Sequence, residues 1–300
     1  DCGGNQMSFL SGFIAIVGPP NVGKSTLLNR ILGKKIAIVS PKPQTTRNRI
    51  TGVYHEPGCQ MVFVDTPGIH RTQTPLHRSM VRSAQSAFKE VDVVALMIEM
   101  PHPRPPEIPL ILSSMRKSKR PAVLVINKID KGRKETLLPM IAAYSESFSF
   151  KSIIPISALT GDGVERLLGE LKSMLREGPA FFPEDLQTDQ SEVFLVSERI
   201  REKIFLHTRQ ELPYSSAVTV ERLEEVPEKD LLSISAKIHV ETESQKGILI
   251  GRGGKMIKQI GQAAREDLEG FFGSRVFLEL LVRVDKNWSK DPRALRRLGY

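Results

Sequence analysis

Short apolar runs alternate with longer amphipathic segments through the first 180 residues. The runs that have the length of buried strands are Phe13–Val17, Met61–Val64, Val93–Ile98, Val123–Ile126 and Ile153–Ile156. Strands that alternate with helices form a mostly parallel sheet with helices on both faces, and the unbroken hydrophobicity of these runs fits burial on both sides. The pattern therefore predicts a doubly wound α/β domain whose ligands bind at the carboxyl ends of the strands.

The pattern changes around residues 178–185, where neither helical nor strand periodicity continues. Beyond this stretch we expect a helix at about 191–209, strands at 217–223 and 232–240, a helix at about 255–270, and a strand at 276–284. The chain is thus predicted to consist of an extension (1–8), an α/β domain (9–178), a linker (179–190) and a smaller α+β domain (191–300). The proline-rich segment 101–106 is read as a loop that leads into a helix near Pro106, rather than as a peptide-recognition segment.

Composition and charge narrow the class of protein. Hydrophobic residues make up 40% of the 300 and charged residues 26%, which is typical of a globular chain, and no apolar run is long enough to span a bilayer. No leader pattern is seen either, so a cytoplasmic location is expected. Cys2 and Cys59 are far apart and lack metal-ligand spacing, which argues against a disulfide framework or a zinc site.

The formal net charge of +9 is unevenly distributed along the chain. Residues 1–180 contain 24 basic and 14 acidic residues, whereas residues 181–300 contain 19 and 20, so the excess lies in the first domain. The second domain is uneven within itself, because Lys246, Arg252, Lys255 and Lys258 follow one another with no acidic residue between them. One face of that domain could therefore be basic although its total charge is near zero.

A phosphate-binding loop of the form GxxxxGKS follows the first apolar run and precedes a leucine-rich helical segment. Backbone N–H groups of such a loop surround a phosphate, Lys24 can bridge β- and γ-phosphate oxygens, and the Ser25 hydroxyl can bind Mg²⁺. The expected phosphate-binding residues are Gly18, Asn21, Val22, Gly23, Lys24, Ser25 and Thr26.

Two further segments have the features of nucleotide-dependent switches. Asp65 ends the second apolar run and can reach Mg²⁺ through water, while the Gly68 N–H can address the γ-phosphate. Thr46 is expected to complete the Mg²⁺ shell, with Thr45 as the alternative. The predicted switch residues are Gln44, Thr45, Thr46, Arg47, Thr66, Pro67 and Gly68. The candidate catalytic residues are Lys24, Thr46 and Gly68, and the candidate metal ligands are Ser25, Thr46 and Asp65.

The base preference is indicated by two motifs that end consecutive strands. The carboxylate of Asp130, in Asn127-Lys128-Ile129-Asp130, can accept hydrogen bonds from guanine N1 and N2, a pair of donors that adenine lacks. Backbone N–H groups after the next strand can bind guanine O6. The predicted guanine-binding residues are Asn127, Lys128, Asp130, Ser157, Ala158 and Leu159.

With these motifs in this order, the first domain resembles a small GTPase of the translation-factor type. It departs from the Ras pattern at Ile69, where Ras-like proteins carry the glutamine that positions the attacking water, so slow hydrolysis is expected. His70 is nearby but is more typical of a surface residue than of a base. In related GTPases an asparagine at the position of Asn21 helps to hold a monovalent cation. Potassium stimulation is therefore a hypothesis, and a role in capping the loop is an equal alternative.

The second domain carries a GxxG loop between two helical segments, in the element order of a type II KH domain, which it resembles. Such a loop lets helix ends approach a nucleic-acid backbone, and a plain glycine-rich turn is the alternative. The predicted RNA-binding residues are Lys246, Gly251, Arg252, Gly253, Gly254, Lys255 and Lys258. The loop offers no catalytic acid or nucleophile, so a binding role is indicated. Trp288, in the basic C-terminal segment, could stack on a base or pack against the domain.

The combination of a GTPase domain with a C-terminal type II KH domain resembles the bacterial Era family over nearly the whole chain. Supporting segments are residues 44–47, 65–68, 211–215, 250–254 and 293–300, whereas Pro19 stands where an arginine is common. The resemblance implies a GTP-dependent switch that uses GTP, GDP and Mg²⁺, and that binds the 3′ end of 16S-type small-subunit rRNA during assembly of the small ribosomal subunit. It also implies peripheral membrane association. We expect a monomer.

Two other function classes are weighed against this reading. A GTP-driven RNA-modification factor would need an additional catalytic element, and the second domain shows none. A membrane-transport GTPase would need spanning helices, which the sequence lacks.

Overall fold

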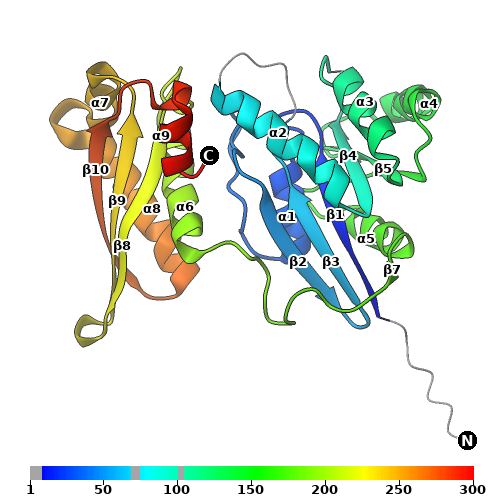
Figure 1. The fold of residues 1–300 in the computed structure, drawn as a ribbon, viewed down its shortest axis with the longest axis horizontal. Helices are drawn as coiled ribbons and strands as arrows, with labels where there is room; N and C mark the ends of the chain where they lie inside the picture. The colour runs from blue at the N-terminus through cyan, green and yellow to red at the C-terminus, as the bar shows by residue number, and fades with distance from the viewer. Residues whose placement is uncertain (1–8, 69–74, 101–104) are drawn as a thin grey trace, which may run out of the picture. The chain divides into compact units, whose positions relative to one another are not determined.

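The computed structural model describes residues 9–68, 75–100 and 105–300, and Figure 1 labels their helices and strands. The chain divides into two compact units. Of the described residues, the first unit contains 9–37, 46–68, 80–100 and 105–189, and the second contains 38–45, 75–79 and 190–300. Each unit has a hydrophobic core of its own.

The first unit is built on a mixed, mostly parallel sheet. Its strands are β1 (Leu10–Val17), β2 (Ile50–Glu56), β3 (Cys59–Asp65), β4 (Val93–Glu99), β5 (Ala122–Asn127), β6 (Ser152–Pro155) and β7 (Arg176–Glu177). In the described residues the order is β2-β3-β1-β4-β5-β6, and β7 pairs with β1. All neighbours are parallel except the β2–β3 and β1–β7 pairs. The predicted fold class is confirmed.

Helices cover both faces of this sheet. They are α1 (Lys24–Leu32), α2 (Pro75–Glu90), α3 (Ile108–Ser118), α4 (Leu137–Ser147), which follows a 3₁₀ turn η1 (Lys134–Thr136), and α5 (Val164–Ser173). The helix expected near Pro106 begins at Ile108. The prolines at 101 and 103 lie outside the described residues. Buried residues of β1, β4 and β5 form a core with α3 and α4. This close packing holds the carboxyl ends of the three strands in fixed positions.

Two strands were not anticipated from the apolar pattern, the two-residue β7 and the longer β2. β2 mixes Thr, Gly and His with its apolar residues, so no strand-like apolar run marks it. It forms because the chain reverses at Gly58, whose φ is 72°, and pairs antiparallel with β3, with Val53 opposite Val62. Pairing with a buried neighbour, rather than its own composition, makes this segment a strand.

The second unit is a small α+β layer structure. Its elements are α6 (Glu192–His207), β8 (Ala217–Val226), a 3₁₀ turn η2 (Pro227–Lys229), β9 (Leu231–Val240), α7 (Glu243–Ile250), η3 (Arg252–Gly254), α8 (Lys255–Phe272), β10 (Arg275–Val284), η4 (Trp288–Lys290) and α9 (Pro292–Arg297). The sheet has the order β10-β9-β8, with β10 parallel and β8 antiparallel to β9. Apolar residues of α6 and α8 pack against the sheet to form the core.

The structure decides between the two interpretations of Trp288. Its side chain is 1% exposed, its indole Nε1 donates to the Ser215 carbonyl at 2.9 Å, and its ring stacks on Tyr300. A buried ring with its only donor satisfied cannot stack on a nucleobase without unfolding this corner. Trp288 therefore packs the domain, and the alternative in which it contacts RNA is wrong for this conformation.

Candidate nucleotide site and nucleic-acid interface

The phosphate loop connects the end of β1 at Val17 with the start of α1 at Lys24. Gly18 has a φ of 157°, and a Cβ there would lie 2.2 Å from the Met97 carbonyl oxygen. Gly23 has a φ of 99°, and a Cβ there would lie 2.4 Å from the Asn127 amide nitrogen. Both positions therefore require glycine, by backbone conformation and by space. The helix start that follows directs its free N–H groups toward the loop.

Lys24 is held by the same loop that it completes. Its ammonium donates to the carbonyls of Gly18 at 3.1 Å and Pro19 at 2.8 Å, and the residue is buried. Burial lowers the pKa of Lys24 to about 8, and the charge of Asp65 opposes that shift. A phosphate group at this place would supply the negative charge that favours the ammonium form.

Three oxygen ligands of the kind that Mg²⁺ prefers meet beside Lys24. Ser25 Oγ donates to Asp65 Oδ2 at 2.7 Å and lies 2.9 Å from Thr46 Oγ1. Asp65 is fully buried, and its Oδ1 has no hydrogen-bond partner in the described part of the chain. Burial raises the pKa of Asp65 to about 6, against the opposing charge of Lys24. A buried carboxylate with an open oxygen beside two hydroxyls fits a magnesium ion.

The structure separates the two threonines that the sequence left as alternatives. Thr45 Oγ1 donates to the Lys42 carbonyl at 2.8 Å and lies 2.6 Å from Ser40 Oγ. The hydroxyl of Thr45 is therefore hydrogen-bonded within its own loop. Thr46 is the residue whose hydroxyl reaches Ser25. Within the described residues no group of three His, Cys, Asp or Glu side chains could hold a metal ion, so the candidate set depends on hydroxyls.

The second switch segment is described only as far as Gly68. Thr66 Oγ1 donates to the Ile16 carbonyl at 2.9 Å, which ties the end of β3 to β1 rather than to a ligand. A Cβ at Gly68 would lie 3.1 Å from Pro20, so the backbone of this glycine runs against the phosphate loop. In the first switch segment Gln44 has a φ of 60° and Arg47 is buried. Ile69 and His70 lie outside the described residues, and slow hydrolysis stays a prediction.

Asn127 joins the guanine motif to the phosphate loop. Its side-chain nitrogen donates to the Val22 carbonyl at 2.7 Å, and its oxygen accepts from the Ala158 N–H at 2.9 Å. Lys128 donates to the Asn21 carbonyl at 2.8 Å and pairs with Glu99. Asp130 is exposed and forms no hydrogen bond or ion pair with the rest of the described chain, so its carboxylate is open to a base. These contacts hold Asn127 and Lys128, the residues that precede Asp130 in the motif, against neighbouring segments.

Residues 157–159 form the second predicted guanine-binding segment, and only some of their backbone N–H groups are free to bind a base. The Ser157 N–H donates to the Asp162 carbonyl and the Ala158 N–H donates to Asn127, so both have acceptors within the protein. Leu159 N is the donor of this tripeptide that remains for guanine O6, and the Leu159 side chain is 62% exposed. A bound base would either use Leu159 N or share the Ala158 donor.

Two residues that the sequence analysis did not select also shape the site. Arg30 donates through Nε to the Ala158 carbonyl at 3.2 Å and through Nη2 to the Leu159 carbonyl, so α1 holds the guanine segment. Glu99 ends β4 and pairs with Lys128. The position of Glu99 at a strand's carboxyl end was a usable signal, because the other site residues share it. Arg30 had no such signal, since its contact spans 128 positions of the chain.

The GxxG loop joins α7 to α8 through three glycines with positive φ, of 74°, 61° and 77° at Gly251, Gly253 and Gly254. A Cβ at Gly251 would lie 2.8 Å from Met256, so this glycine is needed for packing. Gly253 and Gly254 face open space. Bare backbone that faces open space at two helix ends is a surface that a phosphodiester chain can approach closely.

The predicted RNA-binding cations lie on and beside this loop. Arg252, Lys255 and Lys258 are exposed, Lys246 is half-buried, and none of the four forms an ion pair within the described residues. Ile248, in α7, is 55% exposed and adds an apolar surface next to them. Positive charge beside exposed apolar surface suits an unstacked, single-stranded nucleic acid.

Comparison with known proteins agrees with this geometry. A family model described as a 50S ribosome-binding GTPase matches residues 13–128, and a KH domain model matches residues 211–289. GTPase Era of Syntrophus aciditrophicus is 55% identical over 99% of this chain and 97% of its own, and GTPase Era of Geotalea uraniireducens is 52% identical over 98% and 99%. The chain belongs to the Era family of GTPases.

Family membership makes the chain a GTPase and confirms the resemblance drawn from its motifs. The crystal structure of a single-residue variant of Aquifex aeolicus Era bound to GDP·AlF₄⁻ is 39% identical, with a TM-score of 0.94 and coverage of 97% of this chain and 99% of that one. A structure of Era in complex with MgGDPNP and nucleotides 1506–1542 of 16S ribosomal RNA gives the same values. In the part of the chain that the structure describes, no helix is long and apolar enough to cross a membrane.

Proposed function

We propose that the chain binds GTP and GDP with Mg²⁺ in the first unit, and binds the 3′ region of 16S-type small-subunit rRNA through the GxxG loop. In this role it would assist assembly of the small ribosomal subunit. The GxxG loop carries the RNA part of the proposal, because it combines open backbone with unpaired cations. A relative that aligns with 97% of this chain was solved with that RNA region and MgGDPNP.

The residues of the proposed nucleotide site divide the phosphate, guanine and magnesium contacts among them. Lys24 and the N–H groups of the phosphate loop bind the phosphates, and Asp130 reads guanine through its open carboxylate. Ser25, Thr46 and Asp65 would hold the magnesium ion, which neutralises charge on the β- and γ-phosphates when bound. Asn127 supports both regions at once. The Gly68 N–H would contact the γ-phosphate, which is how the second switch would sense the nucleotide.

Potassium dependence remains part of the proposal. Asn21 has a φ of 63° and its carbonyl accepts from Lys128, so the loop conformation is defined without a cation. A bound potassium ion would neutralise phosphate charge where other GTPases use an arginine. Turnover should then be faster in potassium than in sodium at equal ionic strength. Equal turnover in the two buffers would leave Asn21 with the loop-capping role alone.

The domain limits and the cellular setting are also proposed. Residues 9–178, 179–190 and 191–300 are assigned as GTPase domain, linker and KH domain, which is supported by the start of α6 at Glu192 and by the two family matches. We assign a monomer that acts in the cytoplasm, where ribosomal subunits assemble. Peripheral membrane association, which the family resemblance suggested, stays a prediction.

A single charge placed in the GxxG loop tests the RNA assignment. Gly253→Asp is suited to this, because aspartate tolerates positive φ better than most residues and the site is open. The variant should keep wild-type GTP turnover but lose most affinity for an oligonucleotide that spans the 3′ region of small-subunit rRNA. Unchanged affinity in a filter-binding assay would contradict the assignment.

The matched control adds the same charge to the far end of the helix that follows the loop. Gly270→Asp lies in α8, also with open space around its Cβ, and the helical rise puts it roughly 24 Å from Gly254. Its RNA affinity should stay within about twofold of wild type, since it is beyond two Debye lengths at physiological salt. If Gly270→Asp weakens binding as much as Gly253→Asp, the effect comes from net charge and not from the loop.

A further inference from the structure

A second basic surface lies in the first unit, at the opposite end of the sheet from the nucleotide site. A cavity of about 600 Å³, called here the basic pocket, is lined by the end of α3, the start of β5 and the end of α4. β5 begins at Ala122 in this pocket and ends at Asn127 in the guanine site, so strand rise separates the two by roughly 17 Å. The basic pocket is therefore distinct from the GTP site.

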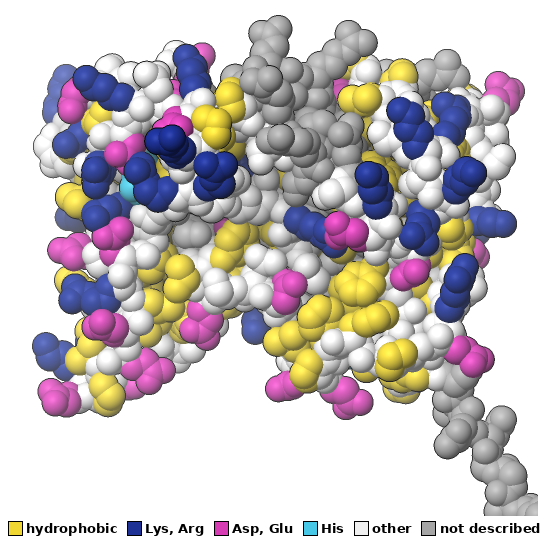
Figure 2. Space-filling view, in the orientation of Figure 1, with side chains coloured by type: hydrophobic (Ala, Val, Ile, Leu, Met, Phe, Trp, Pro, Cys, Tyr) yellow, Lys and Arg dark blue, Asp and Glu magenta, His cyan; other side chains and the backbone are white. Residues whose placement is uncertain are grey.

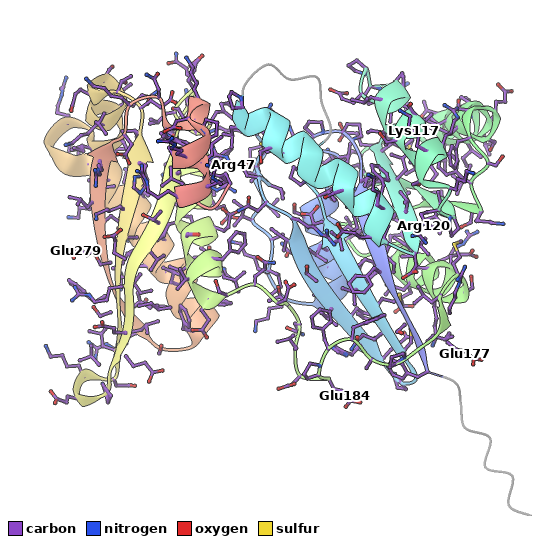
Figure 3. The ribbon with its side chains drawn as sticks, in the orientation of Figure 1. Arg47, Lys117, Arg120, Glu177, Glu184 and Glu279 are labelled. Atoms are coloured by element: carbon purple, nitrogen blue, oxygen red, sulfur yellow. The ribbon has the colours of Figure 1, made fainter. Side chains whose placement is uncertain are left out.

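Its lining is strongly positive. Arg116, Lys119, Arg120 and Lys151 line the pocket, and Glu146 is the acidic residue in the lining. Figure 3 labels Lys117 and Arg120 at this end of α3, and Figure 2 shows dark-blue side chains gathered over the same part of the unit. Four cations against one carboxylate leave a net positive concave surface, which concentrates anions.

The arginines and the lysines of the pocket have different roles. Arg116 donates to the Ser147 carbonyl at 2.7 Å and Arg120 donates to the Lys89 carbonyl at 3.2 Å, near the ends of α4 and α2. Cations at helix carboxyl ends stabilise those helices, so structure accounts for the two arginines. Lys119, the C-cap residue of α3, and Lys151 differ from the arginines, because no side-chain contact accounts for either. Both are exposed, and neither forms an ion pair or hydrogen bond through its side chain with the described residues.

We propose that the basic pocket binds phosphate groups of the folded small-subunit rRNA, outside the strand that the GxxG loop takes. This inference rests on the proposed function and adds a second RNA contact in the GTPase unit. It assigns a role to the basic excess of residues 1–180, which the nucleotide site by itself does not use. Contacts to phosphates carry no base specificity, so they would orient the GTPase on the particle.

A phosphodiester backbone fits the pocket better than a lipid surface does. The pocket is concave, and its lining is mostly polar and charged, with Met115, Pro121, Ala122 and Phe148 as its apolar members. Met115 and Ala122 are buried and Phe148 packs against Phe150, so these side chains offer little surface for an acyl chain. The guanidinium groups are also held in place, which suits fixed phosphate geometry.

The test compares two RNAs with the full-length chain. Lys119→Gln/Lys151→Gln should bind a single-stranded oligonucleotide of the rRNA 3′ region with wild-type affinity. It should bind full-length 16S rRNA about tenfold more weakly at physiological salt, and the slope of log affinity against log salt should decrease by about 2, one for each lost phosphate contact. GTP turnover without RNA should not change, because neither lysine touches the nucleotide site.

The control removes the same charge from elsewhere in the same unit. Arg166→Gln/Arg176→Gln changes two exposed arginines that have no ion pair among the described residues. It should leave both RNA affinities within about twofold. The inference is overturned if the lysine variant binds full-length rRNA as wild type does, or if the control weakens binding equally. It is also overturned if the lysine variant loses only binding to phosphatidylglycerol vesicles, which would assign the pocket to a lipid surface.

Failure of the proposed function would look different. In that case wild-type protein would not bind the 3′ oligonucleotide, or Gly253→Asp would bind it normally, whatever the lysine variant did. The oligonucleotide thus reports on the GxxG loop, and the difference between the two RNAs reports on the basic pocket.

Discussion

The side-chain nitrogen of Asn127 donates a hydrogen bond of 2.7 Å to the carbonyl of Val22, 105 positions earlier in the chain. Both groups are buried, and the Asn127 oxygen accepts at the same time from the Ala158 N–H. One side chain thereby ties the loop that would hold phosphates to the segments that would hold guanine. We therefore expect base binding and phosphate binding to be coupled through Asn127.

Asn127→Ala should lower both the affinity for nucleotide and the stability of the first unit. The change leaves the Val22 carbonyl and the Ala158 N–H without partners, at a cost of about 1–3 kcal/mol for each group. Asn127→Asp is the graded control, since it keeps an acceptor for Ala158 and loses the donor to Val22. In a titration with fluorescent GDP, both variants should bind more weakly than wild type. In thermal unfolding, both should have a lower melting temperature. Wild-type affinity and melting temperature in Asn127→Ala would contradict this linkage.

Gly23→Ala should abolish GTP binding. A methyl group there would lie 2.4 Å from the Asn127 amide in a backbone conformation that disfavours it, so the loop and Asn127 must both move. Gly33→Ala is the matched control, because Gly33 also has a positive φ, of 64°, but has nothing within 4 Å. We expect it to cost about 1 kcal/mol of stability and to retain GTP affinity. Equal nucleotide affinity of the two variants would refute the steric argument.

Trp288→Phe should destabilise the second unit without changing how it binds RNA. The phenyl ring retains apolar contact but cannot donate to Ser215, so a buried carbonyl is left unpaired, at about 1–3 kcal/mol. Urea unfolding should show the loss. RNA affinity, measured where the variant is folded, should equal that of wild type. Loss of RNA affinity with unchanged stability would instead indicate that the indole ring contacts a base.

Acidic pH should lower the stability of the second unit, because Asp285 becomes protonated. Burial would raise the pKa of Asp285, but the hydrogen bond and charge of His239, with the charges of Arg283 and Arg297, outweigh it and hold this pKa below its usual value. The folded state therefore favours the carboxylate. The stabilisation is fully present above the unfolded pKa of about 4 and is lost as the pH falls through the lower, folded value.

The measurement is the difference in unfolding free energy between wild type and Asp285→Asn at several pH values. That difference should shrink as the pH falls below about 4. Asp230→Asn is the control, since Asp230 is exposed and has no ion pair within the described chain. Its difference from wild type should stay flat. A flat curve for Asp285→Asn as well would remove the ion-pair explanation.

Much of the fold could be predicted from the sequence, because apolar runs mark most of the strands locally. The runs that became β1, β3, β4, β5 and β6 are apolar throughout, so strand positions followed from composition. β2 was missed because its residues are mixed and only pairing with β3 makes it a strand. Arg30 was missed for a related reason. Its role depends on a contact 128 positions away, which no local pattern records.

The sequence by itself determined that this protein is a guanine-specific phosphate-loop GTPase joined to a KH-like unit. Those motifs place backbone and side-chain groups at fixed local spacing, so the amino-acid sequence is sufficient to identify them. Tertiary structure alone decided which threonine meets Ser25, which backbone donors near Ala158 remain available, and that Trp288 is buried. It also brought Lys119 and Lys151 to one pocket. Each of these depends on distances between segments far apart in the chain, which only packing sets.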